Sequence, residues 1–109
     1  LDDLLAAIES EPEVARAMIV ISFEVPGSRQ SVRPWYEQLI GTYEAEIAAH
    51  LAAGERDGSV RPGLDHAREA EVFASYAIGL CFRYVTFRDF DFAAELRAWR
   101  KRLKAALAP

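Results

Sequence analysis

Two consecutive amphipathic helices at the end of the chain, over residues 65–87 and 92–107, constrain its fold most. Apolar side chains recur in both at spacings of three and four residues, which is the period of one face of an α-helix. The first pattern has one stripe of small side chains and another of large ones. The second has a single apolar stripe surrounded by basic residues. Two such helices have more apolar surface than they can bury on each other, so they need further partners in this chain or in a second copy.

Turn-forming and capping residues divide the first half of the chain into helical segments. A short apolar pattern over residues 1–8 predicts a leading helical fragment. Ser10 is predicted to cap a second helix, with Pro12 in its first turn, where the missing N–H breaks no hydrogen bond. That helix, residues 14–25, is apolar on almost every side, so we expect it to be buried on several sides. Pro26 is expected to end it.

A long helix is predicted from about Val32 to Asp57. Gly58 follows it and suits the left-handed conformation that closes many helices, with Val60 placed to contact the last turn. Asp65 is the expected N-cap of the next helix. The wetter side of the long helix is predicted to carry Glu37, Gly41, Glu44, Ala48 and Glu55.

These segments predict an all-α fold, an antiparallel helical bundle of four main helices plus a leading helical fragment. No repeat, low-complexity segment or Gly/Ser-rich linker divides the sequence, so residues 1–109 are expected to form one domain. A chain of 109 residues, 51% of them hydrophobic, can build a core without disulfides. The chain does not begin with methionine and its first residues already follow a helical pattern. We therefore expect it to be a piece of a longer polypeptide.

Charge is distributed unevenly along the chain, whose formal net charge is −4. Residues 1–71 hold 14 acids and 6 bases, whereas residues 72–109 hold 3 acids and 7 bases. The overall negative charge argues against binding of nucleic acid through the field of the whole chain. We interpret the basic C-terminal helix as a solvated face rather than a patch for membrane or nucleic acid.

Cys81 is the single cysteine, which excludes an internal disulfide and a cysteine-based metal cluster. It lies in the stripe of small residues, and we interpret it as a buried small hydrophobe rather than a reactive thiol. No apolar run is long enough to span a bilayer, and the acidic start does not resemble a signal peptide. We expect a soluble, cytoplasmic protein that does not bind membranes.

Catalytic and metal-binding patterns are sparse. Glu46 and His50 lie four residues apart on one helix face, and His66 and Glu69 lie three apart at the start of the next helix. A metal site in a helical bundle needs such pairs repeated on facing helices together with further carboxylates. Glycine-rich phosphate loops, nucleophile elbows and zinc-ligand spacings are missing from the sequence. We predict no enzyme activity, no metal and no cofactor.

Tyrosine and tryptophan residues are numerous at positions predicted to be interior. Each carries a polar atom that needs a partner when buried, so several of them together suit a cavity with apolar walls and a few hydrogen-bonding points. Arg83 is placed to meet an acidic ligand or to pair with Glu46. The alternative is that the aromatic side chains fill the core and Arg83 extends to water. The aromatic residues expected inside are Trp35, Tyr36, Tyr43, Tyr76, Tyr84, Phe73 and Phe82.

One family resemblance rests on a turn and on the two helices that follow it. The turn at residues 54–65 reads Gly-Glu-Arg-Asp-Gly-Ser-Val-Arg-Pro-Gly-Leu-Asp. It precedes a helix containing Ala-Ile-Gly-Leu at 77–80 and then Phe-Asp-Phe at 90–92 before a last amphipathic helix. In this order of elements, residues 11–107 resemble the C-terminal half of a TetR-family transcriptional regulator.

The resemblance implies a domain that binds a small apolar or aromatic effector, forms a homodimer through its last two helices and belongs to a repressor. No helix-turn-helix precedes Leu1, so DNA binding would belong to an N-terminal part missing from this chain. The implied effector-binding residues are Met18, Ser22, Tyr36, Tyr43, Ile47, Phe73 and Tyr76, and Arg83 joins them as the candidate for an acidic group. The implied dimer interface consists of Ala70, Ala74, Ala77, Cys81, Leu96, Trp99 and Leu103.

The resemblance also implies a mechanism, in which an effector bound between the helix at 14–25 and the long helix shifts the long helix relative to the dimer core. Two alternatives remain. A purely structural dimerisation module needs the interface but no cavity. A metal-dependent enzyme in a helical bundle would use Glu46 and His50.

Overall fold

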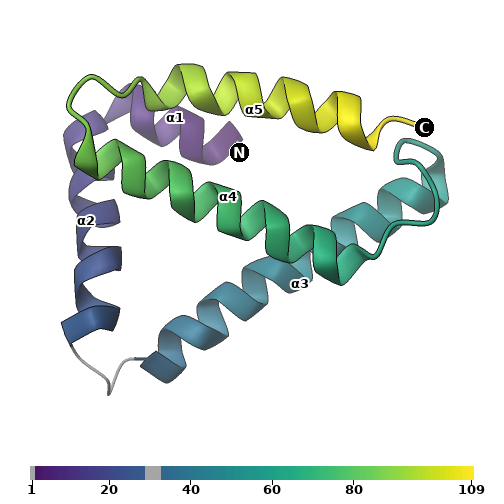
Figure 1. Cartoon of the computed structure of the whole chain (residues 1–109), viewed down its shortest axis with the longest axis horizontal. Helices are drawn as coiled ribbons and strands as arrows, with labels where there is room; N and C mark the ends of the chain where they lie inside the picture. Colours follow the sequence, from purple (N-terminus) through teal and green to yellow (C-terminus); the bar gives the residue numbers. More distant parts are fainter. Residues whose placement is uncertain (1, 29–32) are drawn as a thin grey trace.

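The computed structural model describes residues 2–28 and 33–109, and these form five α-helices with no strand among them. The helices are α1 (Asp2–Ser10), α2 (Pro12–Ser28), α3 (Arg33–Asp57), α4 (His66–Thr86) and α5 (Phe92–Leu107). The prediction of an all-α fold with four main helices and a leading fragment is confirmed, but α2, α3 and α4 cross at large angles instead of forming the predicted antiparallel bundle (Figure 1). Leu1 and Val32, with which the predicted first and third helices begin, lie outside the described residues.

Helix α4 is the element that the other long helices share. α2, α3 and α5 each pack against α4, and α1 packs against α2 and α5 (Figure 1). Figure 1 shows α2, α3 and α4 along the three sides of a triangle, with α1 and α5 above α4. α2 contacts the last turns of α4, whereas the end of α3 lies beside the first turns of α4. The first half of α3 therefore extends away from α4 and is left with little cover.

The main core lies where α1, α4 and α5 meet. Trp99 joins α5 to α4 in this core, because its ring centre lies 4.6 Å from those of both Phe73 and Tyr76. Tyr84 and Phe92 make an edge-to-face pair at 4.9 Å on the other side of this core. The buried members of the cluster are Ile8, Leu80, Tyr84, Phe92, Leu96 and Trp99.

Tyr84 also anchors α2 to α4. Its hydroxyl donates a hydrogen bond to the Pro12 carbonyl oxygen at 3.1 Å. The Arg16 guanidinium covers the Tyr84 ring at 4.3 Å and donates to the Tyr84 carbonyl oxygen at 3.0 Å. Because Pro12 begins α2, these contacts fix the start of that helix on the end of α4.

The predicted caps on α3 and α4 are confirmed. Gly58 has φ +84° after the last residue of α3, and the backbone N–H of Val60 donates to the Gly54 carbonyl oxygen at 3.0 Å. The Asp65 carboxylate accepts from the backbone N–H of Arg68 at 3.2 Å. These local interactions satisfy backbone groups that a helix end leaves without partners.

The predicted N-cap and end of α2 are wrong, whereas the prediction of Pro12 in its first turn is confirmed. The Ser10 hydroxyl donates to the Ala6 carbonyl oxygen at 2.8 Å, so Ser10 closes α1 instead of capping α2. The first turn of α2 is formed by the Ala15 N–H donating to the Glu11 carbonyl oxygen at 3.0 Å. α2 also continues beyond Val25 to Ser28. Pro26 therefore lies in the last turn of α2 and does not end it.

Within the two described ranges, no helix combines the length and the apolar character that crossing a bilayer requires.

Candidate functional site

One side of α2 carries a row of exposed apolar side chains. Val14, Met18 and Ile21 are 56%, 64% and 53% exposed. The prediction that this helix is buried on several sides is therefore wrong. Only the side facing α1 and α4 is covered, and it consists of half-buried Ala15, Arg16, Ile19, Val20 and Phe23.

The first half of α3 carries a second row. Trp35 and Tyr43 are 60% and 58% exposed, and Leu39 between them is also exposed. The side predicted to be wetter is exposed at Glu37 and Gly41 but half-buried at Glu44, Ala48 and Glu55. The prediction of the wetter side is therefore right for the first turns of α3 and wrong for the later ones.

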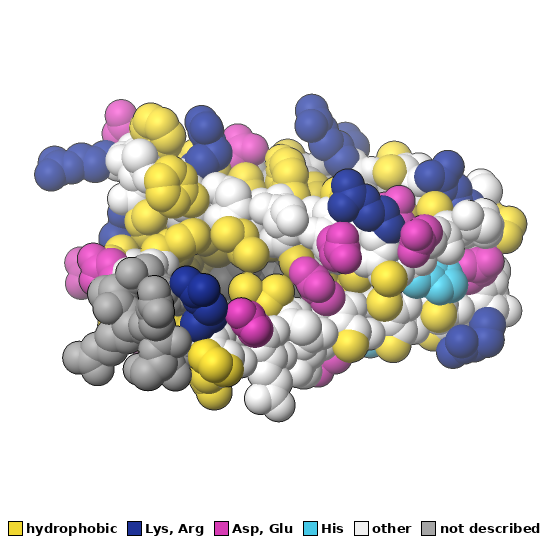
Figure 2. Space-filling view, turned by 60° about the horizontal axis from the view of Figure 1, so that its bottom comes forward, with side chains coloured by type: hydrophobic (Ala, Val, Ile, Leu, Met, Phe, Trp, Pro, Cys, Tyr) yellow, Lys and Arg dark blue, Asp and Glu magenta, His cyan; other side chains and the backbone are white. Residues whose placement is uncertain are grey.

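Several aromatic residues predicted to be interior are exposed. Trp35, Tyr43, Tyr76 and Phe82 lie at the surface, so the prediction is wrong for these four. Tyr84 is buried, and Tyr36 and Phe73 are half-buried. In the view of Figure 2, hydrophobic side chains gather where α2, the start of α3 and the end of α4 lie.

The predicted effector-binding residues fall into two groups. Met18 and Ser22 on α2 and the three predicted residues of α3 lie on two sides of the triangle in Figure 1. The Ser22 hydroxyl donates to the Met18 carbonyl oxygen at 2.9 Å, which satisfies it within α2. Phe73, Tyr76 and Arg83 lie on α4, where Phe73 and Tyr76 both contact Trp99. The α3 residues of the first group are Tyr36, Tyr43 and Ile47.

A groove runs between α4 and α5. It consists of an open depression of about 600 Å³ and a second of about 210 Å³, and Tyr76 lines both. Only Tyr76 and Arg83 of the predicted effector-binding residues line this groove. The larger depression is lined by Ser75, Tyr76, Gly79, Leu80, Arg83, Phe90 and Glu95, and the smaller one by Tyr76, Trp99, Arg102, Leu103 and Ala106.

Arg83 lies over aromatic rings instead of beside an acid. Its guanidinium carbon is 5.0 Å from the centre of the Phe87 ring and 5.7 Å from that of Phe90. It makes no ion pair with Glu46, which the sequence had suggested as a partner. Phe87 and Phe90 hold the cation at the rim of the groove through cation–π contacts, which sequence spacing did not reveal.

The residues predicted for the dimer interface are largely covered by their own chain. Ala70 has no exposed surface, and Leu96 and Trp99 are 2% and 6% exposed. Ala77, Cys81 and Leu103 are half-buried against the same core, and Ala74 is also half-buried. Trp99 and Leu103 also line the smaller depression, whereas the other interface residues do not line the groove.

Burial raises the pKa of the Cys81 thiol from 9.0 to about 11. Desolvation disfavours the thiolate, which is the reactive form of cysteine. Cys81 packs beside the core as a small, protonated side chain, in agreement with its interpretation as a small hydrophobe.

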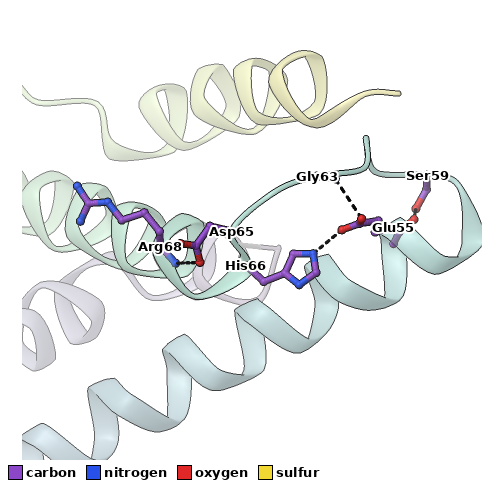
Figure 3. A network of polar contacts seen from close by, with 7 residues as sticks. Glu55, Ser59, Gly63, Asp65, His66 and Arg68 are labelled. Atoms are coloured by element: carbon purple, nitrogen blue, oxygen red, sulfur yellow. Dashed lines mark hydrogen bonds and ion pairs between the residues drawn. The ribbon is translucent and has the colours of Figure 1, made fainter.

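The turn between α3 and α4 contains a polar network centred on Glu55 (Figure 3). Glu55 Oε2 lies 2.5 Å from His66 Nε2, and Glu55 Oε1 accepts from the Gly63 backbone N–H at 3.1 Å. An ionised carboxylate can only accept, so His66 Nε2 is the donor. His66 therefore joins α4 to the end of α3 and does not act with Glu69. Glu46 and His50 lie exposed on α3.

These contacts lower the pKa of Glu55 below its ordinary 4.5, first through the hydrogen bond from His66 and then through that from Gly63. A carboxyl group whose pKa is lower in the folded state stabilises that state above its unfolded pKa, and the effect disappears as the pH falls through the folded value. The Glu55 network should therefore stabilise the fold at neutral pH and lose this effect in acid.

We expect Glu55→Gln to reduce stability at pH 7, because the amide cannot replace the charged acceptor. The difference from the wild-type chain should shrink steadily below about pH 4.5, where the wild-type carboxylate becomes protonated. Urea unfolding at a series of pH values measures this difference, with Glu37→Gln as the exposed control. If the stability difference between the wild-type chain and Glu55→Gln does not change with pH, the charge of Glu55 contributes nothing to stability.

Comparisons with known protein families, with curated proteins and with solved structures give no match to this chain. A proposal about its function has to start from its own residues and their arrangement.

Proposed function

We propose that this chain is the effector-binding and homodimerisation domain of a TetR-like transcriptional repressor. An effector would alter the DNA affinity of a helix-turn-helix domain outside this sequence, and the protein would act in the cytoplasm. The observation that carries the proposal is that α2 and α3, which pack on opposite ends of α4 and approach each other where α2 ends and α3 begins (Figure 1), expose large apolar side chains.

Exposed apolar side chains in this number favour a surface that something covers. Burying apolar area contributes about 25 cal/mol for each Å², so an apolar guest touching both helices gains binding energy from each. Met18 on α2 and Tyr43 on α3 are the most exposed of the proposed contacts. Tyr36 and Trp35 add an edge-to-face aromatic pair, 4.9 Å between ring centres, at the start of α3. These groups suit an effector that is apolar or aromatic.

The arrangement of α2 and α3 also provides a way to couple binding to movement. The two helices pack on different ends of α4, so a guest that contacts both favours one separation of the two helices. A ligand shifts an equilibrium only through different affinities for the two arrangements. In the proposed regulator, the favoured separation is transmitted to the DNA-binding part through the helices that precede this chain.

A thermal-shift screen with apolar and aromatic compounds tests effector binding. A compound at 100 times its Kd should raise the unfolding free energy by about 2.7 kcal/mol. Tyr43→Ala should reduce the response, because it removes an exposed aromatic group without opening the core. Val72→Ala removes another exposed apolar side chain, on α4 and outside the proposed effector contacts, and should keep the response. An unchanged response in Tyr43→Ala would contradict the proposed contact, and a chain that responds to no compound would contradict effector binding.

A purely structural dimerisation module is the second candidate. The groove between α4 and α5 favours it, because this groove offers a surface for a second copy without any guest. A stable dimer that shows no thermal response to the compounds would favour this function over effector sensing.

A further inference from the structure

We propose that a second copy of this chain docks on the α4–α5 groove about a two-fold axis near Ala98, so that Glu95 of each copy lies opposite Arg102 of the other. This inference rests on the homodimerisation in the proposed function and names the contacts that would fix its geometry.

The groove has the shape for a helix of a second molecule. Its two depressions meet at Tyr76 and extend along α4 and α5, from Phe90 at one end to Ala106 at the other. A side chain added at Gly79 would meet nothing within 4 Å, so the floor of the larger depression is open. Val72 and Tyr76, 48% and 42% exposed on α4, supply apolar surface for contact.

Two opposite charges on α5 line this groove. Glu95 lines the larger depression and Arg102 the smaller one. They are seven residues apart, which is two turns and about 10 Å along the helix axis, so they share one side of α5. Both are exposed, and neither forms an ion pair within the described part of the chain. Arg97, on another side of α5, differs because it pairs with Glu9 of α1.

This arrangement of charge is complementary to itself. Glu95 and Arg102 lie at equal distances from a point between Ala98 and Trp99. A two-fold axis through that point makes the two α5 helices antiparallel, which places each Glu95 opposite the partner's Arg102 and forms two identical ion pairs. Arg83 lines the same depression as Glu95, where its guanidinium lies over the Phe87 and Phe90 rings.

The same charges favour a second copy over an unrelated helix. A helix from another protein would need a base and an acid at the same spacing in the reverse order, whereas this chain already carries them. Charge complementarity of this kind sets orientation and excludes wrong registers more than it adds affinity. The apolar groove would supply the affinity, and the two ion pairs would fix the register.

Charge reversal tests the pairing, with the dimer dissociation constant measured by sedimentation equilibrium. Glu95→Arg and Arg102→Glu should each weaken the dimer about 10-fold or more. Each substitution turns both symmetric ion pairs into pairs of like charges. The double variant E95R/R102E restores both attractions, so its Kd should return to within about 3-fold of the wild-type value. Raising the salt concentration to about 1 M should reduce the differences among these proteins.

Lys104→Glu is the matched control, because it reverses a charge on α5 outside the groove lining and should change the Kd little. A wild-type dimer whose Kd is unaffected by either single reversal would overturn the two-fold arrangement and leave homodimerisation intact. Weakening by the single variants without recovery in E95R/R102E would overturn it as well. A wild-type chain that stays monomeric at high concentration would instead contradict the homodimerisation itself.

Discussion

Replacing Trp99 with alanine is expected to lower the free energy of unfolding by about 3–5 kcal/mol. Trp99 is 6% exposed and its ring contacts those of Phe73 and Tyr76 at 4.6 Å. Truncation removes the largest side chain of the core and leaves a cavity that α4 and α5 can close only by moving. Because Trp99 also lines the groove, the variant should lose any dimer along with its stability.

Trp35→Ala is the matched control for this experiment. It makes the same chemical change on α3, where the side chain is 60% exposed, and should alter stability by less than about 1 kcal/mol. Urea unfolding followed by circular dichroism measures both variants without depending on tryptophan fluorescence. Equal effects of the two substitutions would contradict the assignment of the core to α1, α4 and α5.

Helix ends could be predicted from sequence wherever a single local interaction determines them. Asp65 and Gly58 act through their own side chain or backbone conformation, so their roles follow from residue type and position. Ser10 illustrates the limit of this reasoning. A serine between two helices can bond forward as a cap or back to the residue four before it, and here it bonds back to Ala6.

The inward face of α2 and of α3 could not be predicted from periodicity. Met18 and Ile19 are adjacent and both apolar, yet one is exposed and the other half-buried. A helix with apolar residues on nearly all sides has no side that the pattern distinguishes, so its contacts depend on where neighbouring helices lie. On α3 the packing at Leu51 and Gly54, near the end of the helix, sets the orientation of the whole helix, including the exposed first turns around Trp35.

The residues of the candidate sites also divide into features that the sequence predicts and features that it does not. The apolar stripes identify Phe73, Tyr76 and Trp99 as residues that need partners, but their mutual contact was not predicted, because Phe73 and Tyr76 were assigned to the effector site and Trp99 to the dimer interface. The groove was missed because it depends on which small side chains of α4 remain uncovered, and residue type alone does not separate buried Ala70 from exposed Gly79. Glu95 was missed because an acid in the first turn of a helix is common for purely local reasons.

Gly54→Ala should destabilise the protein by about 1–3 kcal/mol, although alanine is the better helix former. A Cβ at residue 54 would lie 2.5 Å from Val60 Cγ2 and 3.2 Å from Ser59 Oγ. Val60 and Ser59 cannot simply move away, because their backbone N–H groups both donate to the Gly54 carbonyl oxygen. The substitution therefore strains the turn that holds the end of α3 against α4.

Gly41→Ala on the same helix provides a control of opposite sign. A Cβ at residue 41 meets nothing within 4 Å, so this variant should gain about 0.5–1 kcal/mol from helix propensity alone. If contact with Val60 is the cause, adding Val60→Ala to Gly54→Ala should recover part of the loss, and the two substitutions should be non-additive in urea unfolding. Similar gains in Gly54→Ala and Gly41→Ala would mean that the turn can relax. In that case, close packing at Gly54 would not determine the position of α3 or of the exposed row from Trp35 to Tyr43.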